Sequence, residues 1–266
     1  MNVFNVECPS VINLYLNGDN GMITKVIDTV DIYDEVEVMI SSKSTVSKIY
    51  LNGTLLIGNN LITMAINSFF NYTKLPPHGV SVKIDKKVPY ELDFNNLDGI
   101  AAGVIISLNK HYRLNLDDKS LYEIASQVSP NVYYYIKGGY HRINGNNDMF
   151  WHNKSIYDSY LIALLKSKDN WSEGINVNDF TSDVSYNNDF YNCLETMAPR
   201  ELRELKDKLM ELKADKVCIN GVNNSVIAYF HNCHDRFNAR EELKKQKVKS
   251  LVAKPCDGIK IRHRYI

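Results

Sequence analysis

Glycine is scarce in this chain. It makes up 13 of the 266 residues, or about 5%, against roughly 7% in an average protein. Loops that wrap phosphate groups with backbone N–H groups depend on glycine, because the chain must approach the ligand closely and adopt positive φ angles. The composition therefore argues against a glycine-rich phosphate loop.

Cysteine pairs and long apolar runs are also missing. The five cysteines are widely spaced and include no CxxC pair, which fits reduced thiols better than a disulfide framework. No stretch approaches the roughly 20 apolar residues of a membrane span. The start, MNVFNVECPS, has neither a basic nor an apolar targeting segment. We therefore expect a cytoplasmic protein without membrane contact.

The chain as a whole carries no excess of charge of one sign, but its last part does. Lys plus Arg equals Asp plus Glu at 31 each, so no global field attracts nucleic acid. Residues 236–266 hold ten Lys and Arg against three Asp and Glu, a local charge of +7. This basic segment predicts the exposed face of a helix near 237–249 followed by a strand. Contact with RNA, DNA or an acidic partner is the alternative.

The remaining composition is that of a globular protein, with 44% hydrophobic and 23% charged residues. Apolar or alternating stretches bounded by turn residues predict strands at 11–16, 24–33, 35–40 and 47–57, and a hairpin at 216–230. Helical spacing of apolar residues predicts helices after Asn59 or Asn60 and at 99–109, 117–128, 155–167, 188–197 and 198–214. Residues 129–143 predict a loop that runs into a strand. Because strands and helices interleave without regular βαβ alternation, we predict an α+β fold.

Six short stretches carry a resemblance. They are CPSVINLYL (8–16), NNLI (59–62), KIDKKVP (83–89), VSPNVYYYIKGG (128–139), CINGVNNSVIAYF (218–230) and VAK (252–254). In order and spacing they resemble motifs of the galactokinase, homoserine kinase, mevalonate kinase and phosphomevalonate kinase (GHMP) superfamily. Within it they look most like the 4-diphosphocytidyl-2-C-methyl-D-erythritol kinases of isoprenoid synthesis. The resemblance implies a ribosomal-S5-like domain at 1–150, a ferredoxin-like domain at 151–266, and a ligand site between them.

The resemblance also implies a phosphate loop that reads approximately GGGLGGGSS and leads into a helix. In this chain residues 91–99 read ELDFNNLDG, so each loop glycine is replaced and Gly99 falls outside the glycine positions. The carboxylates of this segment would repel a triphosphate. We expect Asn95, Asn96 or Asp98 to cap the following helix instead, as vestiges of a nucleotide site.

The positions that the resemblance assigns to catalysis and binding differ as well. A lysine of the first motif and an aspartate of the 128–139 motif face the acceptor hydroxyl in the resembled kinases, and Val11 and Asn131 stand there in this chain. Valine has no charge, and an asparagine amide cannot accept a proton as a base. Asn13 remains on the substrate side, and Asn60 and Gly221 remain on the nucleotide side. The cytosine-binding DGYH motif is replaced by DNGMIT at 19–24.

We therefore predict a catalytically inactive relative of these kinases that binds a protein or an unknown small ligand and needs no cofactor. We expect no metal at His231, Cys233 and His234, because a fourth ligand is missing nearby. The Asn- and Tyr-rich composition suggests an A/T-rich genome, as in a virus or phage. One alternative is an active kinase that uses MgATP to phosphorylate a small alcohol. Another is a nucleic-acid-binding protein that uses residues 236–266.

Overall fold

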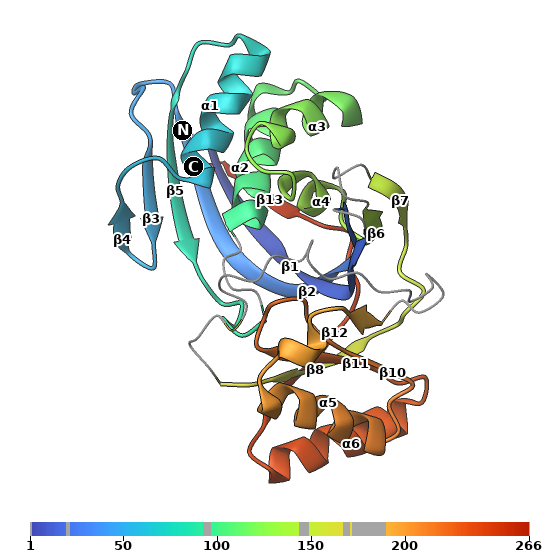
Figure 1. The fold of residues 1–266 in the computed structure, drawn as a ribbon. Coiled ribbons are helices and arrows are strands. Elements are labelled where there is room, and N and C mark those ends of the chain that lie inside the picture. The colour runs from blue at the N-terminus through green and yellow to red at the C-terminus, as the bar shows by residue number, and fades with distance from the viewer. Residues whose placement is uncertain are drawn as a thin grey trace.

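The computed structural model describes residues 2–19, 22–92, 97–143, 149–166, 171 and 190–265. These residues form two antiparallel-rich sheets, each with helices packed on one face (Figure 1). The predicted α+β class is confirmed. The predicted boundary between domains 1–150 and 151–266 stays a prediction.

The larger sheet has nine strands in the described part of the chain, with the order β13-β1-β2-β5-β3-β4 and with β6, β7 and β9 attached beside this path. Its strands are β1 (Asn2–Asp19), β2 (Met22–Ser41), β3 (Lys48–Leu51), β4 (Thr54–Leu56), β5 (Gly79–Asp85), β6 (Tyr140–Ile143), β7 (Met149–Asn153), β9 (Tyr191–Asn192) and β13 (Lys260–Tyr265). The last strand of the chain thus pairs with the first one.

Two long strands form the spine of the molecule. The separate strands predicted at 24–33 and 35–40 are one strand, β2, which pairs antiparallel with β1 along almost its full length. Register shifts between Pro9 and Ser10 and between Asn13 and Tyr15 bend this pair. Because of the bend, the first half of β1 packs in the core under the helices, and its second half packs in a different core against the smaller sheet.

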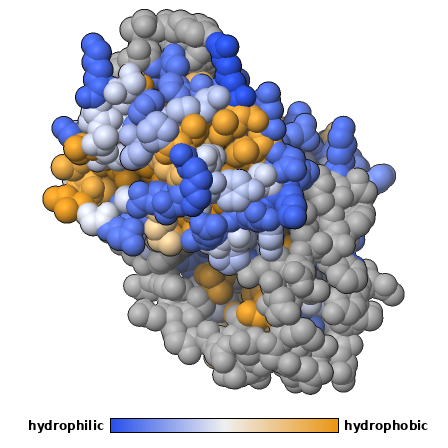
Figure 2. All heavy atoms as spheres, turned by 90° about the horizontal axis from the view of Figure 1, so that it is seen from above, coloured by the Kyte–Doolittle hydropathy of each residue, from blue (hydrophilic) through white to orange (hydrophobic). Residues whose placement is uncertain are grey.

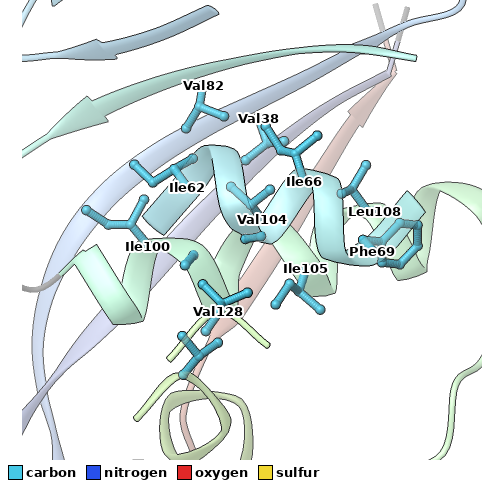
Figure 3. Close-up of a cluster of buried hydrophobic side chains, with 14 of the residues drawn as sticks. Val38, Ile62, Ile66, Phe69, Val82, Ile100, Val104, Ile105, Leu108 and Val128 are labelled. Carbon is cyan, nitrogen blue, oxygen red and sulfur yellow. The ribbon is translucent and has the colours of Figure 1, made fainter. Parts of the chain in front are cut away.

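Four helices cover one face of the larger sheet: α1 (Leu61–Thr73), α2 (Leu97–Tyr112), α3 (Asp118–Ser126) and α4 (Val132–Lys137). Figure 3 shows their core, in which side chains of α1 and α2 pack against Val38 of β2 and Val82 of β5. Small residues let α2 approach the sheet closely. A Cβ on Gly103 would lie 2.9 Å from the Cys8 sulfur. The helix predicted at 99–109 is confirmed, and it is largely buried.

The structure shows side-chain caps on α1 and α3, of which the cap at Asn60 was predicted. The Asn60 side chain accepts hydrogen bonds from the backbone N–H groups of Ile62 and Thr63 at 3.1 and 3.0 Å, and so caps α1. Asp117 caps α3 by accepting from the Ser120 N–H at 2.8 Å. Asn95 and Asn96 lie outside the described residues. Asp98 is the second residue of α2.

The segment 129–143 differs from its prediction, because residues 132–137 form the helix α4 and not part of a strand. Tyr133, Tyr134 and Tyr135 are all buried in this helix. Gly138 ends it with φ of +62°, and a Cβ there would lie 2.1 Å from the backbone nitrogen of Gly258. Consecutive tyrosines favour a strand locally, but packing between α2 and the loop at Gly258 decides for a helix.

The smaller sheet has the order β10-β11-β8-β12, with α5 (Arg200–Glu211) and α6 (Cys233–Lys245) on one face. Its strands are β8 (Tyr160–Leu164), β10 (Lys216–Ile219), β11 (Ser225–Tyr229) and β12 (Lys249–Ala253). The hairpin at 216–230, the helix at 198–214 and the basic helix near 237–249 are confirmed.

Two helix predictions in this part of the chain are wrong. Residues 160–164 form the strand β8, in which every residue is buried, and a short run of apolar residues cannot be told from a buried helix by periodicity. Among residues 188–197, those from 190 on form the two-residue strand β9 and a 3-10 turn at Glu195–Met197.

In the view of Figure 2, the described hydrophobic side chains lie in separate patches among hydrophilic ones. Ile57, 90% exposed, is the most exposed of the large hydrophobic side chains described. None of the helices in the described ranges is long and apolar enough to span a membrane.

Candidate functional site

A cavity of about 170 Å³ lies where the two sheets and the helical layer meet. Strands β1 and β2, the start of α2, the start of α4 and the β10–β11 turn all contribute to its wall. Its lining residues are Val11, Asn13, Lys25, Ile27, Asp98, Asn131, Tyr134, Tyr135 and Asn223. Four residues singled out from the sequence, Val11, Asn13, Asp98 and Asn131, therefore come together here.

A larger hollow of about 570 Å³ lies on the open face of the larger sheet. Charged side chains of neighbouring strands line it, and several are joined in exposed ion pairs such as Lys83–Glu37 and Arg262–Glu7. None of the residues singled out from the sequence lies in it. Such a solvated face explains these charges without a ligand.

Lys25 is the main residue of the cavity that the sequence did not reveal. It lies on β2, and its Nζ donates a hydrogen bond of 2.9 Å to the side-chain oxygen of Asn131. The same Nζ lies 5.2 Å from the centroid of the Tyr134 ring. Burial lowers the pKa of Lys25 to about 8, although the negative charge of Asp98 opposes this shift. The signal in the sequence was a lysine within the predicted strand 24–33.

Asp98 brings a carboxylate to the same cavity. Burial raises its pKa, while hydrogen bonds from Ser129 and Asn131 and the charge of Lys25 oppose the rise. Within the described residues, the Asp98 Oδ1 atom is buried without a hydrogen-bond partner. Asp98 was expected only as a helix cap. Its carboxylate instead accepts hydrogen bonds from Ser129 and Asn131, which lie just before α4.

Asn131 links these two charged groups. Its amide oxygen accepts from Lys25, and its amide nitrogen donates to Asp98. An amide can do both at once because it has a donor and an acceptor on opposite sides. The result is a bridged arrangement of ammonium, amide and carboxylate in one small cavity.

Asn220 ties the edge of the cavity together. It is fully buried, and its side-chain oxygen accepts from the Asn13 backbone N–H at 2.8 Å. Its side-chain nitrogen donates to the Leu92 carbonyl at 2.9 Å and to the Ser225 hydroxyl at 3.0 Å. One side chain therefore joins β1, the start of the 91–99 loop and the β10–β11 hairpin.

The chain that enters the loop is anchored by Asp34 on β2. This carboxylate is fully buried and accepts hydrogen bonds from the backbone N–H groups of Lys87 and Val88 at 2.7 and 3.0 Å. The Lys86 ammonium pairs with it at 2.6 Å. The path from β5 toward α2 is thus fixed up to Leu92, beyond which residues 93–96 are not described.

The other residues singled out from the sequence lie away from the cavity wall or at its edge. Gly221 has φ of +54°, and a Cβ there would lie 3.0 Å from the Asn13 side chain, so glycine suits this turn. Gly99 is buried in α2. Asn60 caps α1 and does not line the cavity.

Similar proteins were found by sequence. No protein-family model matches the chain. A 4-diphosphocytidyl-2-C-methyl-D-erythritol kinase of Prochlorococcus marinus (strain MIT 9215) is 24% identical over 228 residues, which cover 82% of this chain and 68% of that protein. The kinase of the same name from Thermodesulfovibrio yellowstonii is 27% identical over 243 residues, covering 80% of this chain and 82% of that protein.

Solved structures show the same fold. A 4-(cytidine 5'-diphospho)-2C-methyl-D-erythritol kinase superposes with a TM-score of 0.71 at 16% identity, covering 94% of this chain and 98% of that chain. A mevalonate kinase superposes with a TM-score of 0.67 at 17% identity, with the same coverage. At these identities the likeness establishes the fold.

These relatives overturn the prediction of an inactive binding protein. They are named as kinases and come from bacteria, so they favour the active-kinase alternative and lend no support to a viral or phage source. They also argue against the expectation that no cofactor is needed. The prediction compared catalytic positions one by one along the sequence, and it missed Lys25 and the orientation of Asp98 in the same cavity. The chain has the GHMP kinase fold and is similar, in sequence and in structure, to 4-diphosphocytidyl-2-C-methyl-D-erythritol kinases.

Proposed function

We propose that this protein is an ATP-dependent kinase that phosphorylates the hydroxyl group of a small molecule. The observation that carries the proposal is the cavity at the meeting point of the two sheets. Its wall brings together Val11, Asn13 and Asn131, which occupy the positions that the resemblance assigns to the acceptor side. The same wall also carries an ammonium group and a carboxylate, from Lys25 and Asp98.

The region around α2 supports the binding of a triphosphate. This helix has 16 residues and follows the 91–96 segment directly in the sequence, so the positive end of its dipole lies where that segment joins it. Helix N-termini of this kind favour phosphate groups.

Magnesium is compatible with the same arrangement. No group of three His, Cys, Asp or Glu side chains that could hold a metal was found among the described residues. Mg²⁺ that accompanies a nucleotide is held mainly by substrate phosphates and water, with one or two protein carboxylates. Because phosphates and water supply most of its ligands, such an ion needs no dedicated cluster of protein carboxylates. When bound, the ion would offset negative charge on the phosphate oxygens.

The acceptor that the relatives' names suggest is 4-diphosphocytidyl-2-C-methyl-D-erythritol. The segment 19–24 lacks the aromatic and imidazole groups of the resembled cytosine-binding motif. We therefore propose a small polyol or its phosphorylated derivative as the wider acceptor class, with the cytidyl compound as the first member to test.

The test is a phosphoryl-transfer assay with the purified chain, MgATP and a set of acceptors. The set contains 4-diphosphocytidyl-2-C-methyl-D-erythritol, 2-C-methyl-D-erythritol 4-phosphate, mevalonate, homoserine and galactose. We expect acceptor-dependent ADP release and a new phosphate monoester signal by ³¹P NMR with at least one of them. Absence of transfer to every acceptor, together with no thermal stabilisation by MgATP, would reject the proposal. A ligand at 100 times its dissociation constant should add about 2.7 kcal/mol to the free energy of unfolding.

A further inference from the structure

Two charged residues that line the cavity do not stand at the positions that the resemblance assigns to catalysis. Lys25 comes from β2 and Asp98 from the first turn of α2. The positions where a lysine and an aspartate would be expected hold Val11 and Asn131, and all four side chains line the same cavity. Among the described residues, the cavity wall therefore has one lysine and one aspartate, contributed from different backbone positions.

We propose that Lys25 and Asp98 are the catalytic residues of this kinase, and that they have taken over the tasks of positions 11 and 131. This proposal rests on the proposed function. Asp98 is the general base for the acceptor hydroxyl, and Lys25 stabilises the negative charge on the transferred phosphoryl group. Asn131 is a positioning residue that holds the other two.

The hydrogen bonds of Asn131 explain why a carboxylate at position 98 is accompanied by an amide at position 131. Asn131 accepts from Lys25 at 2.9 Å and donates to Asp98. An aspartate at 131 would keep the contact with Lys25 but would place a second carboxylate against Asp98. Two carboxylates in contact repel each other, and the repulsion is stronger in a buried site than in water. Once the carboxylate stands at 98, an amide at 131 is the compatible partner.

The surroundings of both groups suit these roles. Asp98 keeps one buried carboxylate oxygen, Oδ1, without a hydrogen-bond partner among the described residues, and this atom can accept a proton. Burial raises the pKa of Asp98, which makes the carboxylate a stronger base. Lys25, whose pKa is about 8, remains mostly protonated at pH 7 and supplies the positive charge.

The reaction step balances with these two groups. The acceptor oxygen forms a bond to the γ-phosphorus of ATP, and the bond between that phosphorus and the oxygen bridging to the β-phosphate breaks. ADP leaves with the bonding electron pair, and the hydroxyl proton passes to the Asp98 carboxylate. The Lys25 ammonium offsets charge on the phosphoryl oxygens during transfer.

The first experiment compares Lys25→Met and Asp98→Asn with matched controls. The controls are Lys48→Met on β3 and Asp207→Asn on α5, whose side chains are exposed and lie outside the cavity. We expect each cavity variant to lower kcat by about 10²- to 10⁴-fold at unchanged melting temperature, and the controls to keep wild-type kcat. If either cavity variant retains more than half of wild-type kcat, its residue is not catalytic. Absence of transfer by the wild type itself would instead reject the proposed function.

The second experiment returns each charged side chain to the position that the resemblance assigns to it. Lys25→Met combined with Val11→Lys, and Asp98→Asn combined with Asn131→Asp, should recover at least tenfold in kcat over the single variants. A merely structural role for Lys25 or Asp98 would give no such recovery. Failure of both exchanges would overturn the claim that these residues took over the tasks of positions 11 and 131.

A third readout is independent of activity. In protein labelled with ¹³C-lysine, the Lys25 side chain should titrate with a pKa near 8, and Asp98→Asn should lower this pKa because it removes the nearby negative charge. Asp207→Asn should not change it. A Lys25 titration that is the same in wild type and Asp98→Asn would show that the two groups do not interact, and would overturn the proposed pair.

Discussion

Asp28 and Tyr160 are joined by a hydrogen bond of 2.6 Å that runs from β2 of the larger sheet to β8 of the smaller one. Both residues are fully buried, and their strands belong to different sheets. The Tyr160 hydroxyl donates to the carboxylate, and Ser155 donates a further hydrogen bond to it. This contact fixes how the two sheets meet next to the β2 residues that line the cavity.

The buried Asp28 should make stability depend on pH. Burial raises its pKa from 3.8 to about 6, so between these values the folded state binds more protons than the unfolded state. Stability from this group is therefore highest below about pH 4 and decreases as the pH rises to about 6. The decrease is on the order of 3 kcal/mol. Urea unfolding of wild type and Asp28→Asn from pH 4 to 7.5 should show this slope in the wild type only. Equal slopes would contradict the prediction.

Gly138 should tolerate no side chain. A Cβ there would lie 2.1 Å from the Gly258 nitrogen, whereas a Cβ on Gly53, with a similarly positive φ of +83°, would meet nothing within 4 Å. Gly53→Ala is thus a control for backbone strain alone. We expect Gly138→Ala to lower the free energy of unfolding by about 1–3 kcal/mol more than Gly53→Ala. Chemical denaturation measures the free energy of unfolding of both variants. Similar losses would show that the close approach to Gly258 does not affect stability.

Replacing Asn220 with alanine should weaken the junction of β1, the 91–99 loop and the β10–β11 hairpin. It would leave the Asn13 N–H and the Leu92 carbonyl without their partner. A buried group left unsatisfied costs about 1–3 kcal/mol, so we expect a destabilisation of that order or greater by calorimetry. Asn71→Ala, on an exposed position of α1, should change stability by only a few tenths of a kcal/mol. A neutral Asn220→Ala would mean that water replaces these bonds.

The cap at Asn60 predicts a smaller effect. Asn60→Ala removes the acceptor for the Ile62 and Thr63 N–H groups and should lower stability by about 1 kcal/mol. Asn59→Ala is the neighbouring control. Thermal unfolding with and without MgATP distinguishes two roles for Asn60. An equal loss in both conditions indicates a cap alone, whereas a larger loss with MgATP indicates contact with the nucleotide.

The pH dependence of activity should reflect Lys25. Its ammonium form is the active one in our proposal, and its pKa is about 8, so the rate should decrease as the pH rises through about 8. Lys25→Arg keeps the charge at all accessible pH values and should remove this decrease, whatever its effect on the maximal rate. A pH profile of kcat for both proteins measures this. An unchanged decrease in Lys25→Arg would assign it to another group.

Local patterns in the sequence predicted the elements whose partners lie nearby in the chain. The leucines of α5, the cap of α1 and the 216–230 hairpin depend on spacing of three to four residues, on one side chain, or on a turn. The same kind of reasoning failed for α4 and β8. Three consecutive tyrosines and a run of five apolar residues fit either element type, and only burial against distant strands and helices selects one.

The sequence by itself determined the α+β class, the cap of α1, the 216–230 hairpin and the loss of loop glycines, because each depends on residues close together along the chain. Only the tertiary structure decided the chemistry of the cavity. The bend of the β1–β2 pair and the start of α2 bring Lys25 and Asp98 to Asn131, although they are separated by 106 and 33 positions from it. A charge needed at one point in space can come from any strand or helix that reaches it, so a position-by-position comparison of the sequence could not find this pair.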